Sequence, residues 1–201
     1  MLKLVVLASH GGSNMQAIID ATRRGVLPAE VVVVISNNAG SPAAARAGKE
    51  GIPFHHLSGV THPEFERLDV QIARVLSDAD VDLVVLAGYM KKVGPRTINR
   101  FPGRIVNIHP ALLPKFGGVG MYGVRVHQAV IDAGDAQTGV TVHLVDQEYD
   151  RGQIVAQCEV PVLENDDAEA LAARVLEREH AFYVETLCRI ASGELDLDRL
   201  N

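Results

Sequence analysis

Short runs of aliphatic and β-branched residues alternate with longer segments of helical periodicity along this 201-residue chain. The runs predicted as strands are residues 2–8, 31–36, 54–57, 81–87, 105–108, 139–145 and 154–162. The segments predicted as helices are residues 14–24, 42–50, 63–77, 95–100, 124–133 and 167–192. Strands and helices that alternate over the first ~110 residues predict βαβ units, and therefore a parallel sheet with helices on both faces. A short polar turn joins the last two runs, so we expect that pair to be antiparallel.

Composition and charge narrow the class of protein. Hydrophobic residues make up 47% of the chain and charged residues 22%, which is typical of a globular protein and excludes a disordered or coiled-coil chain. Acidic residues outnumber basic ones by 25 to 19 without any Lys/Arg-rich block, so we expect no nucleic-acid partner. The apolar run at the N-terminus is too short to span a membrane and lacks signal-peptide features. We therefore predict a cytoplasmic protein without a membrane partner. No linker or repeat divides the chain, and we expect one domain over residues 1–201.

The first predicted strand leads directly into a glycine-rich turn and a helix. This turn reads Ser-His-Gly-Gly-Ser-Asn over residues 9–14. Ser13 is predicted as the helix N-cap, with Gln16 completing a capping box. The two glycines let the backbone approach a ligand closely, and free N–H groups at a helix start favour an anion. The residues alone leave two alternatives open, a phosphate-binding loop and an ordinary βα turn.

The fifth predicted strand ends in Asn-Ile-His-Pro at residues 107–110. Strand alternation places Asn107 and His109 on the same side of the chain. An amide donor beside an imidazole can hold an oxygen while charge builds on it, and can move a proton. A structural histidine is the alternative. A carboxylate facing His109 would raise the pKa of that histidine, and the turn after the sixth strand offers Asp146, Glu148 and Asp150 without choosing among them.

Two further features could belong to a site. Residues 87–92, Ala-Gly-Tyr-Met-Lys-Lys, follow the fourth strand, where ligands of open α/β sheets bind, although a solvated loop also explains the lysines. Glu179 falls within the apolar stripe of the last helix, which indicates either a structural ion pair or a carboxylate for a ligand amine. The histidines lack metal-ligand spacing and no G-x-S-x-G motif occurs, so we expect no metal and no covalent enzyme intermediate.

The motifs and their order along the chain closely resemble those of the phosphoribosylglycinamide formyltransferase family. The resemblance is carried by residues 9–14 and 87–90, by Asn-Ile-His-Pro-Ala-Leu-Leu-Pro-Lys at 107–115, by Asp-x-Gly at 150–152 and by Glu-His-Ala at 179–181. The Asn-x-His-Pro-x-Leu-Leu-Pro motif marks the wider formyltransferase superfamily, whereas Gly-Ser-Asn and Glu-His-Ala point to this branch. The resemblance runs from residue 2 to about residue 195 and implies a Rossmann-like, mostly parallel seven-stranded sheet.

The resemblance also implies a reaction. Members of this family transfer the formyl group of 10-formyltetrahydrofolate to the amino group of N1-(5-phosphoribosyl)glycinamide in de novo purine (IMP) biosynthesis. We therefore expect direct transfer through a tetrahedral oxyanion intermediate, with 10-formyltetrahydrofolate as cosubstrate and without a metal. The expected partners are small-molecule substrates, and a homodimer is an allowed assembly.

Site residues follow from the same resemblance. Gly12, Ser13 and Asn14 would hold the nucleotide phosphate, and Glu179 would meet the glycinamide end. The implied catalytic residues are Asn107, His109 and Asp150, with Asn107 and His109 stabilising the oxyanion and Asp150 tuning His109. The implied folate-binding residues are Met90, Lys91, Lys92, Val93, Asn107 and Asp146.

The nearest rival is a formyltetrahydrofolate hydrolase, which would use the same Asn, His and Asp with water as acceptor. That relative usually carries an N-terminal regulatory domain, and the Gly-Ser-Asn loop favours a nucleotide acceptor, so we expect the transferase. A methionyl-tRNA formyltransferase normally adds a C-terminal domain that we do not expect here. The chain departs from the commonest family pattern at Lys91-Lys92, His62 and Leu176, and its glycine-rich segment 116–123 is longer than usual.

Overall fold

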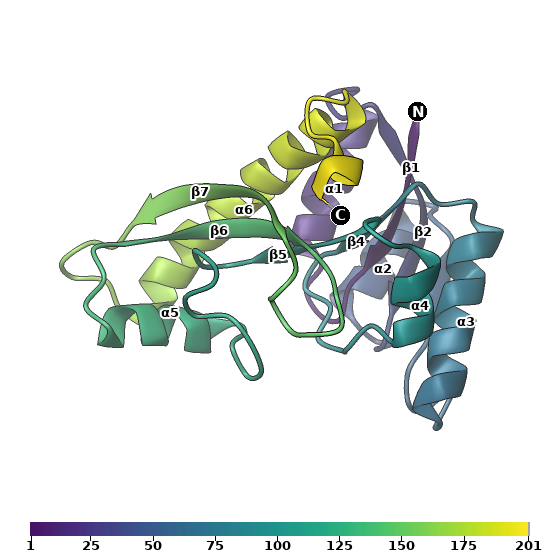
Figure 1. Ribbon diagram of the computed structural model, residues 1–201, viewed down its shortest axis with the longest axis horizontal. Coiled ribbons are helices and arrows are strands. Elements are labelled where there is room, and N and C mark those ends of the chain that lie inside the picture. Colours follow the sequence, from purple (N-terminus) through teal and green to yellow (C-terminus); the bar gives the residue numbers. More distant parts are fainter. Residues whose placement is uncertain (201) are drawn as a thin grey trace.

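The computed structural model describes residues 1–200 and centres on a seven-stranded sheet of order β3-β2-β1-β4-β5-β6-β7 (Figure 1). The strands are β1 Leu2–Leu7, β2 Ala29–Ser36, β3 Phe54–His56, β4 Leu83–Leu86, β5 Ile105–His109, β6 Gln137–Leu144 and β7 Ile154–Pro161. Neighbours from β3 to β5 pair in parallel, whereas β5–β6 and β6–β7 are antiparallel. The predicted Rossmann-like, mostly parallel seven-stranded α/β sheet, with its antiparallel last pair, is confirmed.

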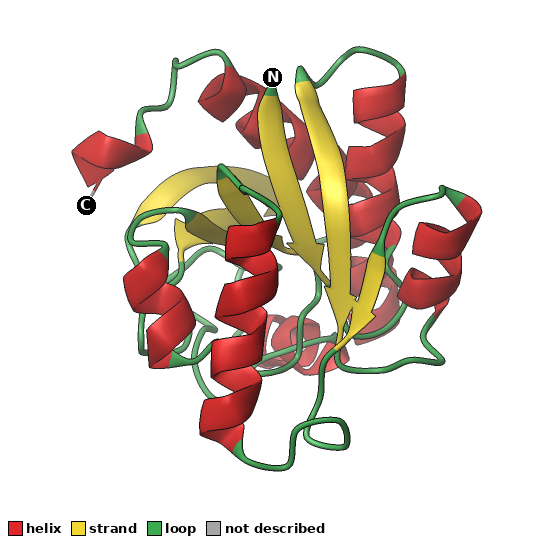
Figure 2. Cartoon of the chain, turned by 90° about the vertical axis from the view of Figure 1, so that its right-hand side faces the viewer, coloured by secondary structure: helices red, strands yellow, loops and turns green. Residues whose placement is uncertain are grey.

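Within residues 1–200, six α-helices and a short 3-10 helix pack around the sheet (Figure 2). They are α1 Ser13–Arg23, α2 Pro42–Lys49, α3 Phe65–Asp78, α4 Pro95–Arg100, α5 Val124–Asp132, α6 Ala168–Ala191 and η1 Leu197–Leu200. Each predicted helix is present within two residues at either end, and only η1 was not predicted. The largest shift is at α3, because Glu64 keeps an extended backbone (φ −83°, ψ 121°) and delays the helix start.

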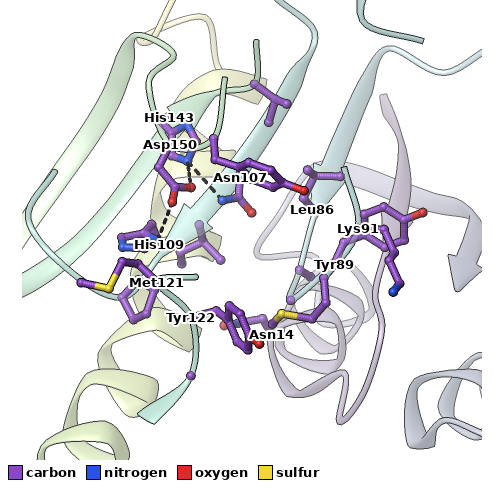
Figure 3. A pocket seen from close by; sticks show the side chains of 18 of the residues that line it. Asn14, Leu86, Tyr89, Lys91, Asn107, His109, Met121, Tyr122, His143 and Asp150 are labelled. Atoms are coloured by element: carbon purple, nitrogen blue, oxygen red, sulfur yellow. Dashed lines mark hydrogen bonds and ion pairs between the residues drawn. The ribbon is translucent and has the colours of Figure 1, made fainter. Parts of the chain in front are cut away.

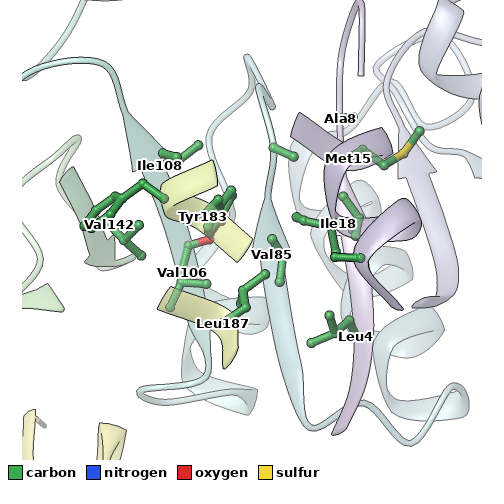
Figure 4. Close-up of a cluster of buried hydrophobic side chains, with 14 of the residues drawn as sticks. Leu4, Ala8, Met15, Ile18, Val85, Val106, Ile108, Val142, Tyr183 and Leu187 are labelled. Atoms are coloured by element: carbon green, nitrogen blue, oxygen red, sulfur yellow. Dashed lines mark hydrogen bonds between the residues drawn. The ribbon is translucent and has the colours of Figure 1, made fainter. Parts of the chain in front are cut away.

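Both faces of the sheet are buried, as expected for parallel strands covered by helices. In β1, Leu4 and Val6 face a core formed with α1, α2, α5 and α6 (Figure 4), whereas Val5 and Leu7 face a second core formed mainly with α3. All four of these side chains are fully buried. The two-residue alternation of β1 therefore holds helices on both faces at once.

One buried hydroxyl ties the long helix α6 to the centre of the sheet. Tyr183 is fully buried, and its hydroxyl donates to the carbonyl oxygens of Leu86 (3.0 Å) and Val106 (3.2 Å). These two carbonyls belong to β4 and β5, so one side chain of α6 bridges two neighbouring strands.

A carboxylate from α3 caps the next helix. Asp69 is 2% exposed and accepts hydrogen bonds from the N–H groups of Arg96 (2.8 Å) and Thr97 (3.0 Å) and from the Thr97 hydroxyl (2.6 Å). Helix α4 has Gly94 as its N-cap residue, which offers no side-chain acceptor. A Cβ atom at Gly94 would lie 2.1 Å from Cγ of Asp69, so only glycine fits there. Asp69 thus fixes the start of α4 and the end of the loop before it.

Over residues 1–200, none of the helices combines the length and the apolar character needed to cross a membrane.

Candidate active site

A cavity of about 690 Å³ opens over the carboxyl ends of β1, β4 and β5 (Figure 3). Ligands of doubly wound α/β sheets bind at this edge. The cavity is lined by every residue that the sequence placed in a site: Gly12, Ser13, Asn14, Met90, Lys91, Lys92, Val93, Asn107, His109, Asp146, Asp150 and Glu179. Segments from five distant parts of the chain therefore meet around one space. No group of three His, Cys, Asp or Glu within residues 1–200 is arranged to hold a metal ion.

The glycine-rich turn after β1 differs from the predicted capping box. Gly12, with φ 68° and ψ 26°, is the N-cap residue of α1, and Ser13 is already helical. The left-handed conformation of Gly12 starts the helix one residue early, so no side chain caps it and the Ser13–Gln16 prediction is wrong. Gln16 instead binds Asp20 and Arg46.

Gly12 is also required by packing. A Cβ atom there would lie 2.9 Å from Cβ and 3.0 Å from Cα of Ala43 in α2, besides needing a left-handed backbone. Among the hydrogen bonds of the described residues, none uses the N–H groups of Gly11, Gly12 or Ser13. Unpaired N–H groups at a helix N-terminus are suited to an anion such as phosphate.

Asn107 is held by a histidine across the sheet. The two residues pair in the register of β5 and β6, and Nδ2 of Asn107 lies 3.1 Å from Nε2 of His143. Nδ1 of His143 lies 2.8 Å from the Leu144 carbonyl oxygen, which can only accept, so Nδ1 carries the hydrogen. In the neutral ring, Nε2 then accepts one N–H of Asn107 and leaves the second N–H of the amide for a ligand oxygen.

His109 is 4% exposed, with a polar group facing each of its ring nitrogens. Its Nε2 donates to the carbonyl oxygen of Phe116 (2.8 Å), and its Nδ1 lies 3.6 Å from Oδ2 of Asp150. Burial lowers the pKa of His109 below its ordinary value, and the negative charge of Asp150 and the Phe116 carbonyl oppose that shift. A protonated His109 therefore depends on Asp150 remaining ionised.

Asp150 is the carboxylate that faces His109, whereas Asp146 caps its own turn by accepting the N–H of Glu148 (2.8 Å). Oδ2 of Asp150 accepts the N–H of Gly118 (2.9 Å), and Oδ1 lies 3.5 Å from Nε2 of His143. Burial raises the pKa of Asp150, but His143, His109 and the Gly118 N–H outweigh it, and the net pKa lies below the ordinary value. The geometry therefore identifies Asp150 as the carboxylate facing His109, a choice that the residues alone left open.

Two residues beside His109 have strained backbones. Phe116 (φ 58°) and Asp150 (φ 56°) both adopt the left-handed conformation, which costs about 1 kcal/mol for a residue with a Cβ atom. Phe116 supplies the carbonyl for Nε2 of His109, and Asp150 supplies the carboxylate for Nδ1. Strain of this kind concentrates at functional sites, where surrounding contacts hold it in place.

Glu179 projects from α6 into the cavity and is 8% exposed. Burial raises its pKa to about 7, and the side chain of Asn14 opposes part of that shift. No ion pair within residues 1–200 involves Glu179, so the structural ion pair considered from the sequence is not found. A buried carboxylate without a cation is suited to a ligand that brings its own N–H groups or positive charge.

The loop after β4 forms another wall of the cavity. Val93 is buried, Met90 is 41% exposed, and Lys91 and Lys92 are exposed at the cavity mouth. Ser9 connects this wall to the glycine-rich turn after β1, because its hydroxyl accepts the N–H of Met90 (2.7 Å). His62 does not line the cavity.

Several cavity residues were not predicted as site residues, and His143, Tyr122 and His127 are the notable ones. His143 bridges Asn107 and Asp150, and its role depends on the β5–β6 register, which sequence periodicity does not reveal. Tyr122 extends from the long glycine-rich segment toward Asn14 at the start of α1 (Figure 3). His127 of α5 is buried with Nδ1 unpartnered among the described residues, and burial, followed by the charge of His109, lowers its pKa to about 4.

Comparisons with known proteins agree with this geometry. Residues 2–187 match the family model described as formyl transferase. Phosphoribosylglycinamide formyltransferase of Haemophilus influenzae is 41% identical over 98% of this chain and 91% of its own length. A chloroplastic phosphoribosylglycinamide formyltransferase of Vigna unguiculata is 44% identical over 92% of this chain, which spans only 59% of that relative. The crystal structure of glycinamide ribonucleotide transformylase 1 from Symbiobacterium toebii superposes with a TM-score of 0.89 at 39% identity, covering 96% of this chain and 89% of that one.

A formyltetrahydrofolate deformylase from Pseudomonas syringae shares the fold alone, with a TM-score of 0.85 at 24% identity over 96% of this chain and 62% of that one. Family model, relatives and structures therefore converge on the relationship indicated by the motifs. The chain belongs to the formyl transferase family and, within it, to the phosphoribosylglycinamide formyltransferases.

Proposed function

We propose that this protein transfers the formyl group of 10-formyltetrahydrofolate to the amino group of N1-(5-phosphoribosyl)glycinamide in de novo purine biosynthesis. The observation that carries the proposal is one cavity that joins Asn107, His109 and Asp150 to a loop with unpaired N–H groups and to Glu179, a carboxylate without an ion pair among the described residues. The relatives named above carry this activity in their names.

The nucleotide fits the side of the cavity formed by α1 and α6. Its phosphate would bind the free N–H groups of Gly11, Gly12 and Ser13, for which the described residues offer no other acceptor. Glu179 would accept hydrogen bonds from the glycinamide end, and an amine there would favour the ionised carboxylate. Both contacts would use groups that have no charged partner among the described residues.

The donor fits the wall after β4. Apolar side chains at Leu86, Val93 and Val145 line this part of the cavity, and Lys91 and Lys92 lie at its mouth. A flat heterocycle with an acidic tail suits an apolar slot that ends in exposed cations. The donor supplies the formyl carbon, and Met90, Lys91, Lys92, Val93, Asn107 and Asp146 are the residues proposed to hold it.

The step forms a bond between the amine nitrogen and the formyl carbon and breaks the bond between that carbon and N10 of the folate. The free N–H of Asn107 stabilises the oxygen that becomes negative. A proton on Nδ1 of His109, shared with Asp150, adds positive charge beside that oxygen. The proton that leaves the amine returns to N10, and His109 with Asp150 is placed to relay it.

The runner-up function is hydrolysis of the same donor, with water in place of the amine. The phosphate loop and Glu179 favour the nucleotide acceptor, because hydrolysis would need neither. Consumption of 10-formyltetrahydrofolate is measured with and without N1-(5-phosphoribosyl)glycinamide, and formate and the formylated product are quantified. We expect product only with the acceptor. Release of formate without it would favour the hydrolase and refute the transferase, and His109→Ala is the control for catalysis at this site.

We also propose that the substrates are the sole partners needed for turnover and that residues 1–201 act as one catalytic domain in the cytoplasm. Activity of the purified chain without added proteins tests the first point. Cell fractionation tests the location, and light scattering tests whether the protein is a homodimer.

A further inference from the structure

Arg46 lies behind the phosphate loop and outside the cavity. It belongs to α2, and its Nε donates to the carbonyl oxygen of Gly11 (3.0 Å). Its Nη1 donates to Oε1 of Gln16 in α1 (3.3 Å). The guanidinium therefore connects the loop to the two helices that flank it, at a point where it is half-buried.

The hydrogen bond to Gly11 sets the direction of the next N–H group. In a trans peptide, the carbonyl of one residue and the N–H of the following residue point in opposite directions. Because the Gly11 carbonyl is directed toward Arg46, the Gly12 N–H is directed away from Arg46, toward the cavity that Gly12 lines.

The neighbouring peptides are oriented in the same way. The His10 carbonyl accepts the N–H of Ala43 (3.0 Å), which turns the Gly11 N–H outward, and the Gly12 carbonyl accepts the N–H of Gln16 (2.9 Å), which turns the Ser13 N–H outward. The three carbonyl groups are thus bonded on one side of the turn, and the three free N–H groups that follow them point to the other side. Backbone bonds fix the first and the third, whereas a side chain fixes the second.

Packing holds the Gly11–Gly12 peptide on its Gly12 side, against Ala43, but not on its Gly11 side. Gly11 is exposed, and no atom would lie within 4 Å of a Cβ atom built there. Glycine also has the largest conformational freedom to lose. Without Arg46, no side chain would hold the Gly11 carbonyl, and rotation about the Gly11 bonds would turn the Gly12 N–H away from the cavity.

We infer that Arg46 is a positioning residue for phosphate binding, which acts through the Gly11 carbonyl on the Gly12 N–H without touching the ligand. The inference rests on the proposed function, since it assumes that the ligand is a nucleotide with a phosphate. It also explains how an acidic protein of net charge −6 presents an anion site, because the guanidinium places a positive charge behind the loop.

The test compares Arg46→Ala with a matched control, Arg23→Ala. Arg23 also connects α1 to α2, through the Glu50 carbonyl (2.8 Å), but makes no contact with the loop. Binding of N1-(5-phosphoribosyl)glycinamide and of its dephosphorylated nucleoside is measured by calorimetry without folate. We expect Arg46→Ala to weaken nucleotide binding about tenfold and leave nucleoside binding unchanged, because the lost contact serves the phosphate alone. Arg23→Ala should bind both like the wild type.

Two further measurements keep the inference falsifiable. Arg46→Lys retains a donor for the Gly11 carbonyl and should recover most of the loss. In the 15N-labelled protein, inorganic phosphate should shift the Gly12 amide resonance in the wild type and much less in Arg46→Ala. Equal weakening for nucleotide and nucleoside, or no weakening at all, would overturn the inference. A wild-type protein that binds the nucleotide tightly yet shows no formyl transfer would refute the proposed function and leave the role of Arg46 intact.

Discussion

Oδ2 of Asp150 lies 3.6 Å from Nδ1 of His109, across a gap that becomes a charge-assisted hydrogen bond only when the imidazole is protonated. The neutral ring carries its hydrogen on Nε2, where it donates to Phe116. Protonation of Nδ1 therefore both creates the contact with Asp150 and supplies the charge that an oxyanion needs. The two residues operate as a unit whose strength depends on pH.

Replacement of Asp150 should shift the pH profile of the reaction to lower pH. The carboxylate opposes the lowering of the His109 pKa by burial, so Asp150→Asn lowers that pKa further. Activity that needs protonated His109 falls as pH rises through this pKa, and the falling limb of kcat/KM therefore moves toward acid. At pH 7 we expect losses of about 10²–10³-fold for Asp150→Asn and for His109→Ala.

Asp146→Asn is the matched control for this prediction, because Asp146 lines the same cavity without facing His109. It should leave the position of the limb unchanged. If Asp150→Asn keeps the wild-type turnover and the falling limb of kcat/KM at the wild-type pH, Asp150 does not tune His109.

The sequence predicted the architecture because the two periodicities of strand and helix are local properties of the chain. Local patterns could not choose among Asp146, Glu148 and Asp150, since that choice depends on how the turn after β6 folds over β5, and only the family resemblance indicated Asp150. The sequence also could not reveal His143, whose contact with Asn107 is a cross-strand pair 36 residues apart. The Ser13 cap was wrong because the left-handed Gly12 starts α1 earlier than side-chain preference alone indicates.

Glu179→Gln should stabilise the free protein at neutral and higher pH. Burial raises the pKa of Glu179 from 4.5 to about 7, so the folded state disfavours the ionised carboxylate. Below pH 4.5 the carboxyl is protonated in both the folded and the unfolded state, so its burial costs no stability. The loss of stability grows as the pH rises to about 7. The variant should therefore gain up to about 3 kcal/mol in free energy of unfolding at pH 8 and nothing at pH 4.

Urea unfolding at both pH values measures this gain, and Glu177→Gln, an exposed neighbour on the same helix, is the control. Nucleotide binding should weaken in Glu179→Gln even though its stability rises. A variant that is no more stable at pH 8 than at pH 4, relative to the wild type, would show that Glu179 is adequately solvated or paired in the free protein.

Gly12→Ala should destabilise the protein by about 1–2 kcal/mol. The new methyl group would lie 2.9 Å from Cβ of Ala43 and would force an unfavourable φ of 68°. Gly11→Ala, one residue earlier, meets no atom within 4 Å and should keep the wild-type free energy of unfolding. Thermal unfolding of the pair distinguishes a packing requirement from a general need for glycine, and equal stabilities would contradict it.

Asp69→Ala should lower stability by about 2–3 kcal/mol and raise the KM for 10-formyltetrahydrofolate. The change leaves the N–H groups of Arg96 and Thr97 and the Thr97 hydroxyl without their acceptor. It also frees Gly94, which follows Val93, one of the residues proposed to hold the folate. Asp78→Ala, at the exposed end of the same helix, should change neither quantity. An unaltered KM for the donor would show that the loop before α4 holds its shape without Asp69.

The hydroxyl of Tyr183 fixes more than the packing of α6. Glu179 precedes Tyr183 by four residues, about one helical turn, so the carboxylate is positioned relative to β4 and β5 by a bond made inside the core. β5 also carries Asn107 and His109. Under the proposed function, the separation between Glu179, which would meet the acceptor, and Asn107 and His109, which would flank the formyl carbon, is therefore set away from solvent. The fold would then select the length of the acceptor, because a longer or shorter amine would bind without reaching the formyl carbon.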